Sequence, residues 1–216
     1  MLITGFEGYG GRGVNPAEEV VKALDGADIG GTSVQAAVLP VTYRTLQPRL
    51  RELIATQRPS AIIATGLWPG EPMIRLERFA VNLNAFEIPD NTGQVVSGPI
   101  NTDGELAHKS TLPVEVIRRR LLEKGIPART SSSAGNFLCN AAMYCALEAV
   151  RDLGLEIPCG FIHVPYLPIQ VADILRDLEE KQALELHQRG DLASMDLEVT
   201  VEALRIAIAT TMEATG

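Results

Sequence analysis

Short apolar runs, each closed by a turn rich in glycine, proline or polar residues, recur along the chain. "MLITGF" ends in a glycine-rich loop, and "SAIIATG" and "CGFIHV" are apolar almost throughout. Runs of this length and composition are typical of strands buried on both faces of a sheet. The pattern predicts strands within residues 1–6, 33–41, 60–66, 73–84, 127–133 and 159–164.

Between these runs, apolar residues recur at helical spacing. Asn15, Pro16 and Glu18 supply a cap, a first-turn proline and an acidic residue three positions after the cap. A second helix is expected after Thr42 as its cap, and Pro48 falls early within it. Further helices are expected at 113–125, from about residue 136 onward, at 171–190 and at 196–214.

The alternation of strands and helices predicts an α/β fold. We expect a single-domain α/β/α sandwich with a mostly parallel (mixed) central sheet. A chain of 216 residues suits one domain, taken here as residues 1–216. Residues 85–112 are rich in Asn, Asp, Gly and Pro and predict a long ordered loop, and loops of that length are usually functional.

Composition and charge restrict the class of protein. The net charge is −8 and the sequence pI is near 5, which argues against nucleic acid as a partner because phosphate binding needs a basic surface. "MLITGF" has neither a basic flank nor a long apolar run, so we expect no signal peptide and no membrane span. An odd number of cysteines, three, favours reduced thiols and a cytoplasmic protein.

The stretch Gly8–Gly13, "GYGGRG", matches the glycine pattern of dinucleotide-binding loops. In that motif the helix begins within the glycines, so that its amides face the pyrophosphate. Here the helix-start residues Asn15 and Pro16 follow the last glycine, and the expected acidic residue at the end of the next strand is absent. A turn that lines a pocket is the favoured interpretation, with nucleotide binding kept as an alternative.

The three cysteines differ in their expected surroundings. Cys145 falls on an apolar helical stripe and reads as an inert core residue. Cys139 lies in the first turn of the same helix, off that stripe, where the helix dipole and free amides should lower the pKa of its thiol. Cys159 lies near the start of a strand and is a poor candidate nucleophile. Cys139 is therefore the candidate nucleophile, provided that a base lies within reach.

Of the three histidines, His163 is the candidate base. It lies near the carboxyl end of an apolar strand, and ligand crevices of open α/β sheets lie beyond such ends. A satisfied core histidine remains the alternative interpretation. His108, in the long loop, and His187, in a polar helix, are expected to be solvated surface residues.

Glu77 stands out because strand alternation places it on the same face as the apolar Phe79 and Val81. A carboxylate on such a face needs a partner. Arg75 or Arg78 could supply it in a structural ion pair, or Glu77 could orient the imidazole of His163 toward a thiol. The sequence has no histidine pair and no Cys-x-x-Cys, so we expect no metal site and no cofactor.

Five short motifs, in this order and spacing, resemble the pyroglutamyl peptidase I (pyrrolidone-carboxylate peptidase) family. They are "TGFEGYGG" with "NP" shortly after, "ERFAVN", "IPDNTG", "SSAGNFLCN" and "GFIHVPYLP", and they extend over nearly the whole chain. The resemblance implies a cytoplasmic α/β cysteine peptidase, usually a homotetramer, that removes an N-terminal pyroglutamyl residue from peptides.

The same resemblance implies roles for individual residues. The catalytic residues of the family fall on Glu77, Cys139 and His163, which the chemistry above had also singled out. The first loop is implied to form the pocket for the lactam ring, with Phe6, Tyr9, Asn15 and Leu67 as expected pocket residues.

Two positions depart from the family pattern. Gly8 and Tyr9 replace a Pro-Phe pair, and Glu87 replaces an arginine before "IPDN". We expect Glu87 to turn away from the thiol, toward solvent or a loop arginine. A cysteine hydrolase of another small amide or lactam is the remaining alternative activity.

Overall fold

The computed structural model describes residues 1–183 and 191–215 and is built on one six-stranded sheet. The strand order is β11 (Ala128–Ser131), β6 (Ile74–Glu77), β12 (Cys159–Val164), β5 (Ile62–Leu67), β1 (Leu2–Phe6) and β4 (Gln35–Leu39). From β12 to β4 the neighbours are parallel, whereas β6 is antiparallel to β12 and parallel to β11. The predicted mostly parallel, mixed sheet is confirmed.

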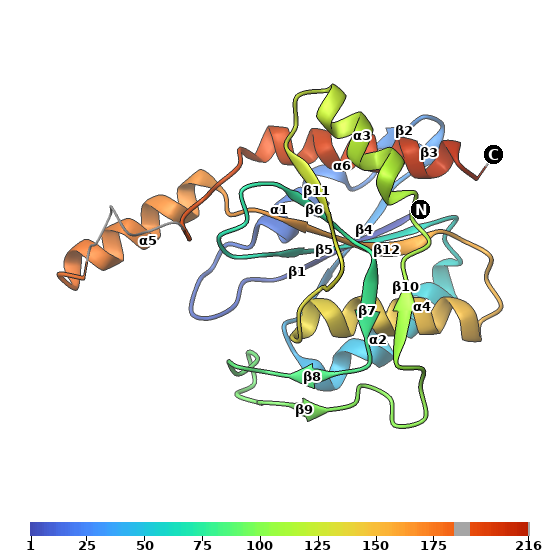
Figure 1. The fold of residues 1–216 in the computed structure, drawn as a ribbon, viewed down its shortest axis with the longest axis horizontal. Coiled ribbons are helices and arrows are strands. Elements are labelled where there is room, and N and C mark those ends of the chain that lie inside the picture. The colour runs from blue at the N-terminus through green and yellow to red at the C-terminus, as the bar shows by residue number, and fades with distance from the viewer. Residues whose placement is uncertain (184–190, 216) are drawn as a thin grey trace.

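Helices cover both faces of the sheet (Figure 1). On one face lie α1 (Pro16–Leu24), α3 (Val114–Glu123) and α6 (Leu197–Glu213), and on the other lie α2 (Tyr43–Gln57) and α4 (Leu138–Asp152). Each face has its own apolar core, because successive residues of a strand point to opposite sides: Leu2 packs toward α2 and α4, and Ile3 toward α1 and α6. The result is an α/β/α sandwich.

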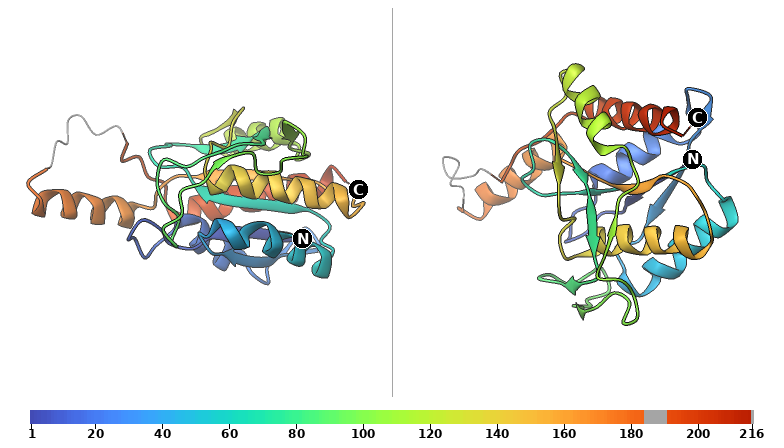
Figure 2. Two further views of the ribbon diagram at one scale, coloured as in Figure 1. Left: turned by 90° about the horizontal axis from the view of Figure 1, so that it is seen from below. Right: turned by 45° about the vertical axis from the view of Figure 1, so that its right-hand side comes forward.

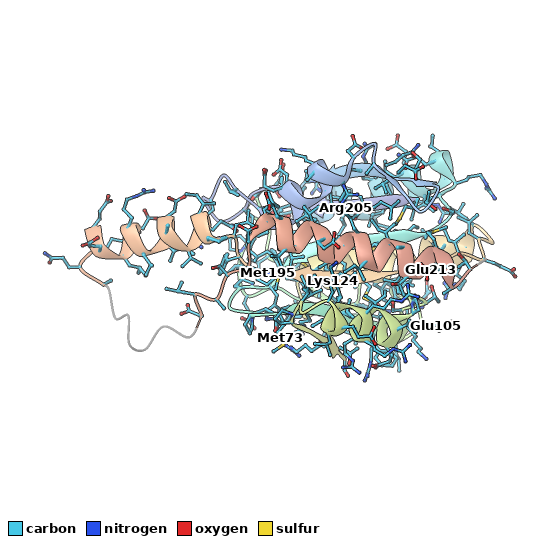
Figure 3. All side chains as sticks on the ribbon, turned by 90° about the horizontal axis from the view of Figure 1, so that it is seen from above. Met73, Glu105, Lys124, Met195, Arg205 and Glu213 are labelled. Atoms are coloured by element: carbon cyan, nitrogen blue, oxygen red, sulfur yellow. The ribbon has the colours of Figure 1, made fainter. Side chains whose placement is uncertain are left out.

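Helices α3 and α6 lie side by side in one layer (Figure 3), and side-chain contacts join them. Glu213, near the end of α6, forms an ion pair with Arg120 of α3, whose Nη2 lies 2.6 Å from the Glu213 Oε2. The Arg120 guanidinium also donates to the Thr210 hydroxyl at 3.1 Å. These contacts join the two helices side by side, on the face of the sheet away from α4.

Of the two helix caps that the sequence predicts, one is present in the structure and the other is replaced by a distant residue. The Asn15 side chain accepts from the Ala17 amide at 3.0 Å, as a cap does, and Pro16 begins α1. Thr42 precedes α2 but its side chain makes no capping bond. The carboxylate of Asp90 accepts from the Tyr43 amide instead, at 2.9 Å, so a residue distant in sequence replaces the predicted cap.

The predicted strand over 73–84 is wrong as a single element. The chain leaves the central sheet after β6, where the Arg78 amide donates to Ser131 and its carbonyl accepts from Ser110. Residues Phe79–Val81 form β7, which pairs with β10 (Ala107–Lys109) in a separate two-stranded sheet. Alternation therefore does not continue through Arg78: Glu77 is fully buried, whereas Phe79 is 37% exposed.

The predicted loop over 85–112 also contains regular structure. Besides β10 it holds β9 (Ser97–Gly98), which pairs with β8 (Asn84–Ala85). A further short hairpin, β2 (Asp28–Ile29) with β3 (Thr32–Ser33), precedes β4. The side chain of Asn82 fixes the rest of the loop by accepting from the amides of Ile100 and Asn101 at 2.8 and 2.9 Å.

One helix extends away from the sandwich. Helix α5 (Pro168–Glu180) extends outward beyond the two helical layers (Figures 1 and 2). It was predicted over 171–190, and residues 184–190, which include His187, lie outside the described residues. Among the described helices, none is both long enough and apolar enough to cross a bilayer.

Candidate active site

A cavity of about 240 Å³ opens at the carboxyl ends of the parallel strands. Phe6 is the last residue of β1 and Leu67 the last of β5, and His163 is next to last in β12. Because these strands are parallel neighbours, their ends meet at one edge of the sheet. The residues that the sequence singled out for the site, apart from Glu77, line this cavity: Phe6, Tyr9, Asn15, Leu67, Cys139 and His163.

Cys139 is the second residue of α4 and enters the cavity from the helix start. Its Sγ packs against the backbone of β5 at Gly66, where a Cβ would lie only 2.6 Å from the sulfur. Gly66 is the register partner of His163 on the neighbouring strand β12. Paired residues of parallel strands point to the same face, so the thiol and the imidazole share one side of the sheet.

Sequence reasoning did not identify Gly66, although its signal was present. A glycine inside an apolar strand often marks a close approach of another group to the backbone. Here that group is the nucleophile candidate, and the ring of Phe161 would lie 2.9 Å from the same Cβ. Gly66 therefore supplies the space that lets Cys139 reach the sheet.

His163 is fully buried and bonded to a carboxylate on one side only. Its Nδ1 lies 2.8 Å from Oε1 of Glu77, and its Nε2 is buried with no hydrogen-bond partner among the described residues. A carboxylate acceptor at Nδ1 favours the tautomer with the proton on Nδ1. Nε2 is then left as the basic nitrogen of the site.

Glu77 has both of the partners that the sequence left open. Besides His163, its Oε1 accepts from Nε of Arg75 at 2.6 Å. Arg78, the other possible arginine, pairs instead with the exposed Glu115 on α3. The carboxylate is thus at once a buried ion-pair partner and the acceptor that orients the imidazole.

Burial dominates the electrostatics of the thiol and the imidazole. Burial, with a smaller contribution from the Glu77 carboxylate, raises the pKa of Cys139 to about 12. Burial also lowers the pKa of His163 below its ordinary 6.5, against the opposing effect of Glu77. The predicted lowering of the thiol pKa is therefore wrong for this structure, because removal from water outweighs the helix end. Near neutral pH the resting pair is an uncharged thiol beside an uncharged imidazole.

The other cysteines lie away from the cavity. Cys145 is buried in the middle of α4, where burial raises its pKa to about 12, and Cys159 lies at the opposite end of β12 from His163. Within the described part of the chain, no cluster of three His, Cys, Asp or Glu side chains could hold a metal ion.

His108 differs from its predicted position on the surface. It is half-buried in β10, and its ring packs on Tyr144 with the centroids 4.4 Å apart. Burial lowers its pKa. The reason is that β10 lies against α4, so the loop that carries His108 is covered by that helix.

The first loop contributes a wall of the cavity. Its helix, α1, begins at Pro16, after the last glycine, as predicted. Tyr9 lines the cavity near Cys139, and burial raises the pKa of its phenol to about 12. Asn15 donates from Nδ2 to the Glu7 carbonyl at 2.8 Å, which fixes its side chain in the same wall.

Glu87 and Trp68 complete the cavity. Glu87 is exposed to solvent and also lines the cavity, so it faces partly toward the site that we expected it to avoid. Trp68, which sequence reasoning missed, packs on His163 in a T-shaped arrangement, with the centroids 5.0 Å apart and the ring planes at 82°. An isolated tryptophan after an apolar strand gave no signal that distinguished a wall residue from a core residue.

Comparison with known proteins agrees with this geometry. A family model described as pyroglutamyl peptidase matches residues 1–214. Pyrrolidone-carboxylate peptidase of Pyrococcus furiosus is 39% identical over 99% of this chain and 98% of its own, and that of Bacillus licheniformis is 36% identical over 96% and 89%. The solved pyrrolidone carboxyl peptidase of Thermococcus litoralis superimposes with a TM-score of 0.90, at 36% identity over 99% of this chain and 93% of its own.

Proposed function

The chain belongs to the pyroglutamyl peptidase family, and from this premise we propose that Cys139, His163 and Glu77 are its catalytic triad. As a member it is a cysteine-type peptidase that removes an N-terminal pyroglutamyl residue from peptides. The observation that carries the triad is the line of contacts from Glu77 Oε1 to His163 Nδ1, with the opposite ring nitrogen unpartnered in the described chain and Cys139 on the same sheet face.

Acylation begins with transfer of the Cys139 proton to Nε2 of His163. The sulfur attacks the pyroglutamyl carbonyl carbon, and the carbonyl oxygen gains the negative charge. The amides of the first turn of α4 have no partners within the helix and are placed to hold that oxyanion. Because burial raises the pKa of Cys139 to about 12, the sulfur needs His163 to take its proton before it can attack.

Collapse of this intermediate breaks the scissile C–N bond. His163, now protonated, gives its proton to the leaving amine, and the pyroglutamyl group remains on Cys139 as a thioester. Water then attacks the thioester with His163 as base, which releases pyroglutamate and restores the thiol. Glu77 accepts from Nδ1 in both half-reactions and stabilises the imidazolium that forms in each.

The pocket residues suit a flat, uncharged ring. Phe6 and Leu67 offer apolar surface, and Tyr9 offers an aromatic face. Asn15 uses one Nδ2 hydrogen on the Glu7 carbonyl, so the other is free to donate to the lactam oxygen. A free α-amine would enter this largely apolar pocket as a cation, and the carboxylate in the lining, Glu87, is exposed to solvent.

The test compares chromogenic amides of pyroglutamate, proline and glutamine. We expect turnover of the pyroglutamyl amide only, because proline and glutamine carry a charged amine. Comparable turnover of all three would instead identify a broader amide hydrolase.

A matched pair of variants tests the nucleophile. Cys139→Ser should abolish turnover with an unchanged circular dichroism spectrum, whereas Cys145→Ser, the same substitution deeper in α4, should retain it. Activity in Cys139→Ser would overturn the triad.

We extend the proposal to organisation and assembly. The chain forms one catalytic domain over residues 1–216, acts in the cytoplasm and assembles as a homotetramer. The three cysteines, all free, suit a reducing compartment. The outlying helix α5 and the family resemblance support assembly (Figure 2).

A further inference from the structure

Arg75, on β6, is a buried cation with four distinct contacts. Its Nε donates to Glu77 Oε1 at 2.6 Å, and its Nη2 donates to the Ser133 carbonyl at 2.6 Å. Nη1 lies 3.6 Å from a carboxylate oxygen of Glu71. The guanidinium also lies over the ring of Trp68, 3.6 Å from its centroid. The side chain is only 9% exposed, so these contacts replace nearly all of its hydration.

These contacts join three parts of the active site. Glu77 holds the imidazole of His163. Ser133 lies in the segment that leads from β11 into the start of α4, which carries the nucleophile. Trp68 lines the cavity and packs on His163 in a T-shaped arrangement. One guanidinium thus joins the carboxylate that holds His163 to the segment before Cys139.

We propose that Arg75 is a positioning residue for the reaction, which holds Glu77 directed at His163 and anchors the segment before Cys139. This role rests on the triad proposed above. Arg75 does not line the cavity, so it acts through Glu77, Ser133 and Trp68 and not on the substrate.

The chemistry of arginine fits this role. A guanidinium stays charged when buried, and its planar fork donates in fixed directions while its face stacks on an aromatic ring. Glu77 is fully buried, and its second oxygen, Oε2, has no partner among the described residues. Without the cation, this buried carboxylate would lose its ion pair and the donor that fixes its direction. A lysine has one point of charge and cannot donate to Glu77 and Ser133 in the same geometry.

The charges around His163 come from several elements and nearly balance. Glu77 and Arg75 lie on β6, and Glu71 lies in the loop before it. Arg129 of β11 pairs with Glu71, with its Nε 3.1 Å from Oε1. Loss of Arg75 leaves one negative charge in excess beside the imidazole, and that charge would raise the pKa of His163. Cys139 and Tyr9, which also face the site, are uncharged near neutral pH because both have raised pKa values.

The experiment compares Arg75→Gln with Arg78→Gln in the full-length enzyme. Arg78→Gln is the matched control. Arg78 lies three residues along the chain, and its ion pair with Glu115 is exposed to solvent. We expect Arg75→Gln to lower kcat by about tenfold or more with KM within about twofold. The acidic limb of its pH–kcat/KM profile should move up by at least about half a pH unit. Arg78→Gln should match the parent in both.

Two further variants separate positioning from stability. In a Glu77→Gln background, Arg75→Gln should add little further loss of kcat, because Arg75 acts largely through that carboxylate. Arg75→Lys keeps the charge, so its acidic limb should stay at the parent position while kcat falls, and it provides the readout if Arg75→Gln does not fold. Any of three results would overturn the proposal. The first is a parent-like kcat and pH profile in folded Arg75→Gln, the second is a multiplicative loss of kcat in the double variant, and the third is a parent-like kcat in Arg75→Lys.

Failure of the triad is distinguishable from failure of this role. Turnover by Cys139→Ser would refute the proposed triad, and the proposed role of Arg75 with it. An inactive Cys139→Ser together with a parent-like Arg75→Gln would remove the role of Arg75 alone.

Discussion

At the scale of the residue, His163 is the centre of the site. Its Nδ1 is bonded to Glu77, and its ring is enclosed by Phe161 and Trp68 at centroid distances of 4.7 and 5.0 Å. The ring therefore has little freedom to rotate. An imidazole held in this way can move a proton between Cys139 and the leaving group without first reorienting.

Glu77 and His163 should consequently behave as a unit. Glu77→Gln keeps the shape of the side chain but removes its charge, so we expect a large fall in kcat with little change in KM. In the double variant Glu77→Gln/His163→Ala, kcat should be little lower than in His163→Ala alone. Steady-state kinetics of the four proteins measure this, with Glu115→Gln as the surface control. If the two losses of kcat multiply, the two residues act separately, and Glu77 is only the structural ion-pair partner of Arg75.

The pH dependence of activity follows from the same residue. Burial lowers the pKa of His163 below 6.5, so the imidazole stays uncharged and able to accept a proton down to pH values below 6.5. As the pH falls through that lowered pKa, the ring gains a proton and can no longer take one from Cys139. We therefore expect the acidic limb of kcat/KM below pH 6.5. A limb at or above the ordinary histidine value would show that Glu77 outweighs burial.

Glu87 allows a third prediction at this scale. It lines the cavity yet is exposed, so water screens its charge from the reacting carbonyl. Glu87→Ala should change kcat/KM by less than about tenfold. Gln94→Ala, in the same long loop, is the control for the substitution. A full-unit shift in the acidic limb would mean that the carboxylate faces the thiol.

At the scale of the element, the packing of α4 on β5 decides whether the thiol reaches the base. Gly66→Ala would place a Cβ 2.6 Å from Cys139 Sγ and 2.9 Å from the ring of Phe161. Neither neighbour can move freely, because one starts a buried helix and the other lies in the core. We expect a fall in kcat and in the rate of alkylation of Cys139.

The matched control for this substitution is Gly13→Ala. A Cβ at Gly13 meets nothing within 4 Å, so the variant should behave as the parent. Circular dichroism separates a displaced thiol from a lost fold. Full activity in Gly66→Ala would show that the sulfur does not depend on this close approach.

The elements also show how far the sequence could predict this structure. β1 and β12 were predictable because each is a continuous apolar run closed by a turn, and the site followed from their shared carboxyl ends. The break at Arg78 was not, because no glycine or proline marks it and it depends on bonds to Ser131 and Ser110, both distant in sequence.

Electrostatics were the least accessible to sequence reasoning. The helix-start position of Cys139 was read correctly, yet the direction of its pKa shift was not, because burial is a property of the assembled layers. The partners of Glu77 were likewise left open. Both arginines are close in sequence, and only the fold brings one of them and His163 to the same oxygen.

At the scale of the whole molecule, the sandwich and α5 differ in how they are supported. The other described helices pack into the two cores on either side of the sheet, whereas α5 extends beyond these cores (Figure 2). One small cluster joins it to the body, in which Ile174 packs with Leu67 and Tyr166 and the partly buried Val171 and Leu178 pack against them. Ile169, at its start, is 57% exposed. A second chain that covered this helix would give it the support that one chain does not.

The assembled enzyme should therefore be larger than one chain. Multi-angle light scattering at micromolar concentration should give about four times the 23.3 kDa chain mass, in line with the proposed tetramer. The mass should be the same for Cys139→Ser, because Cys139 lines the cavity and the substitution exchanges only sulfur for oxygen. A dilution series then measures how tightly the chains associate. A particle of 23.3 kDa across that series would refute the tetramer, and α5 would have to be stable with one face in water.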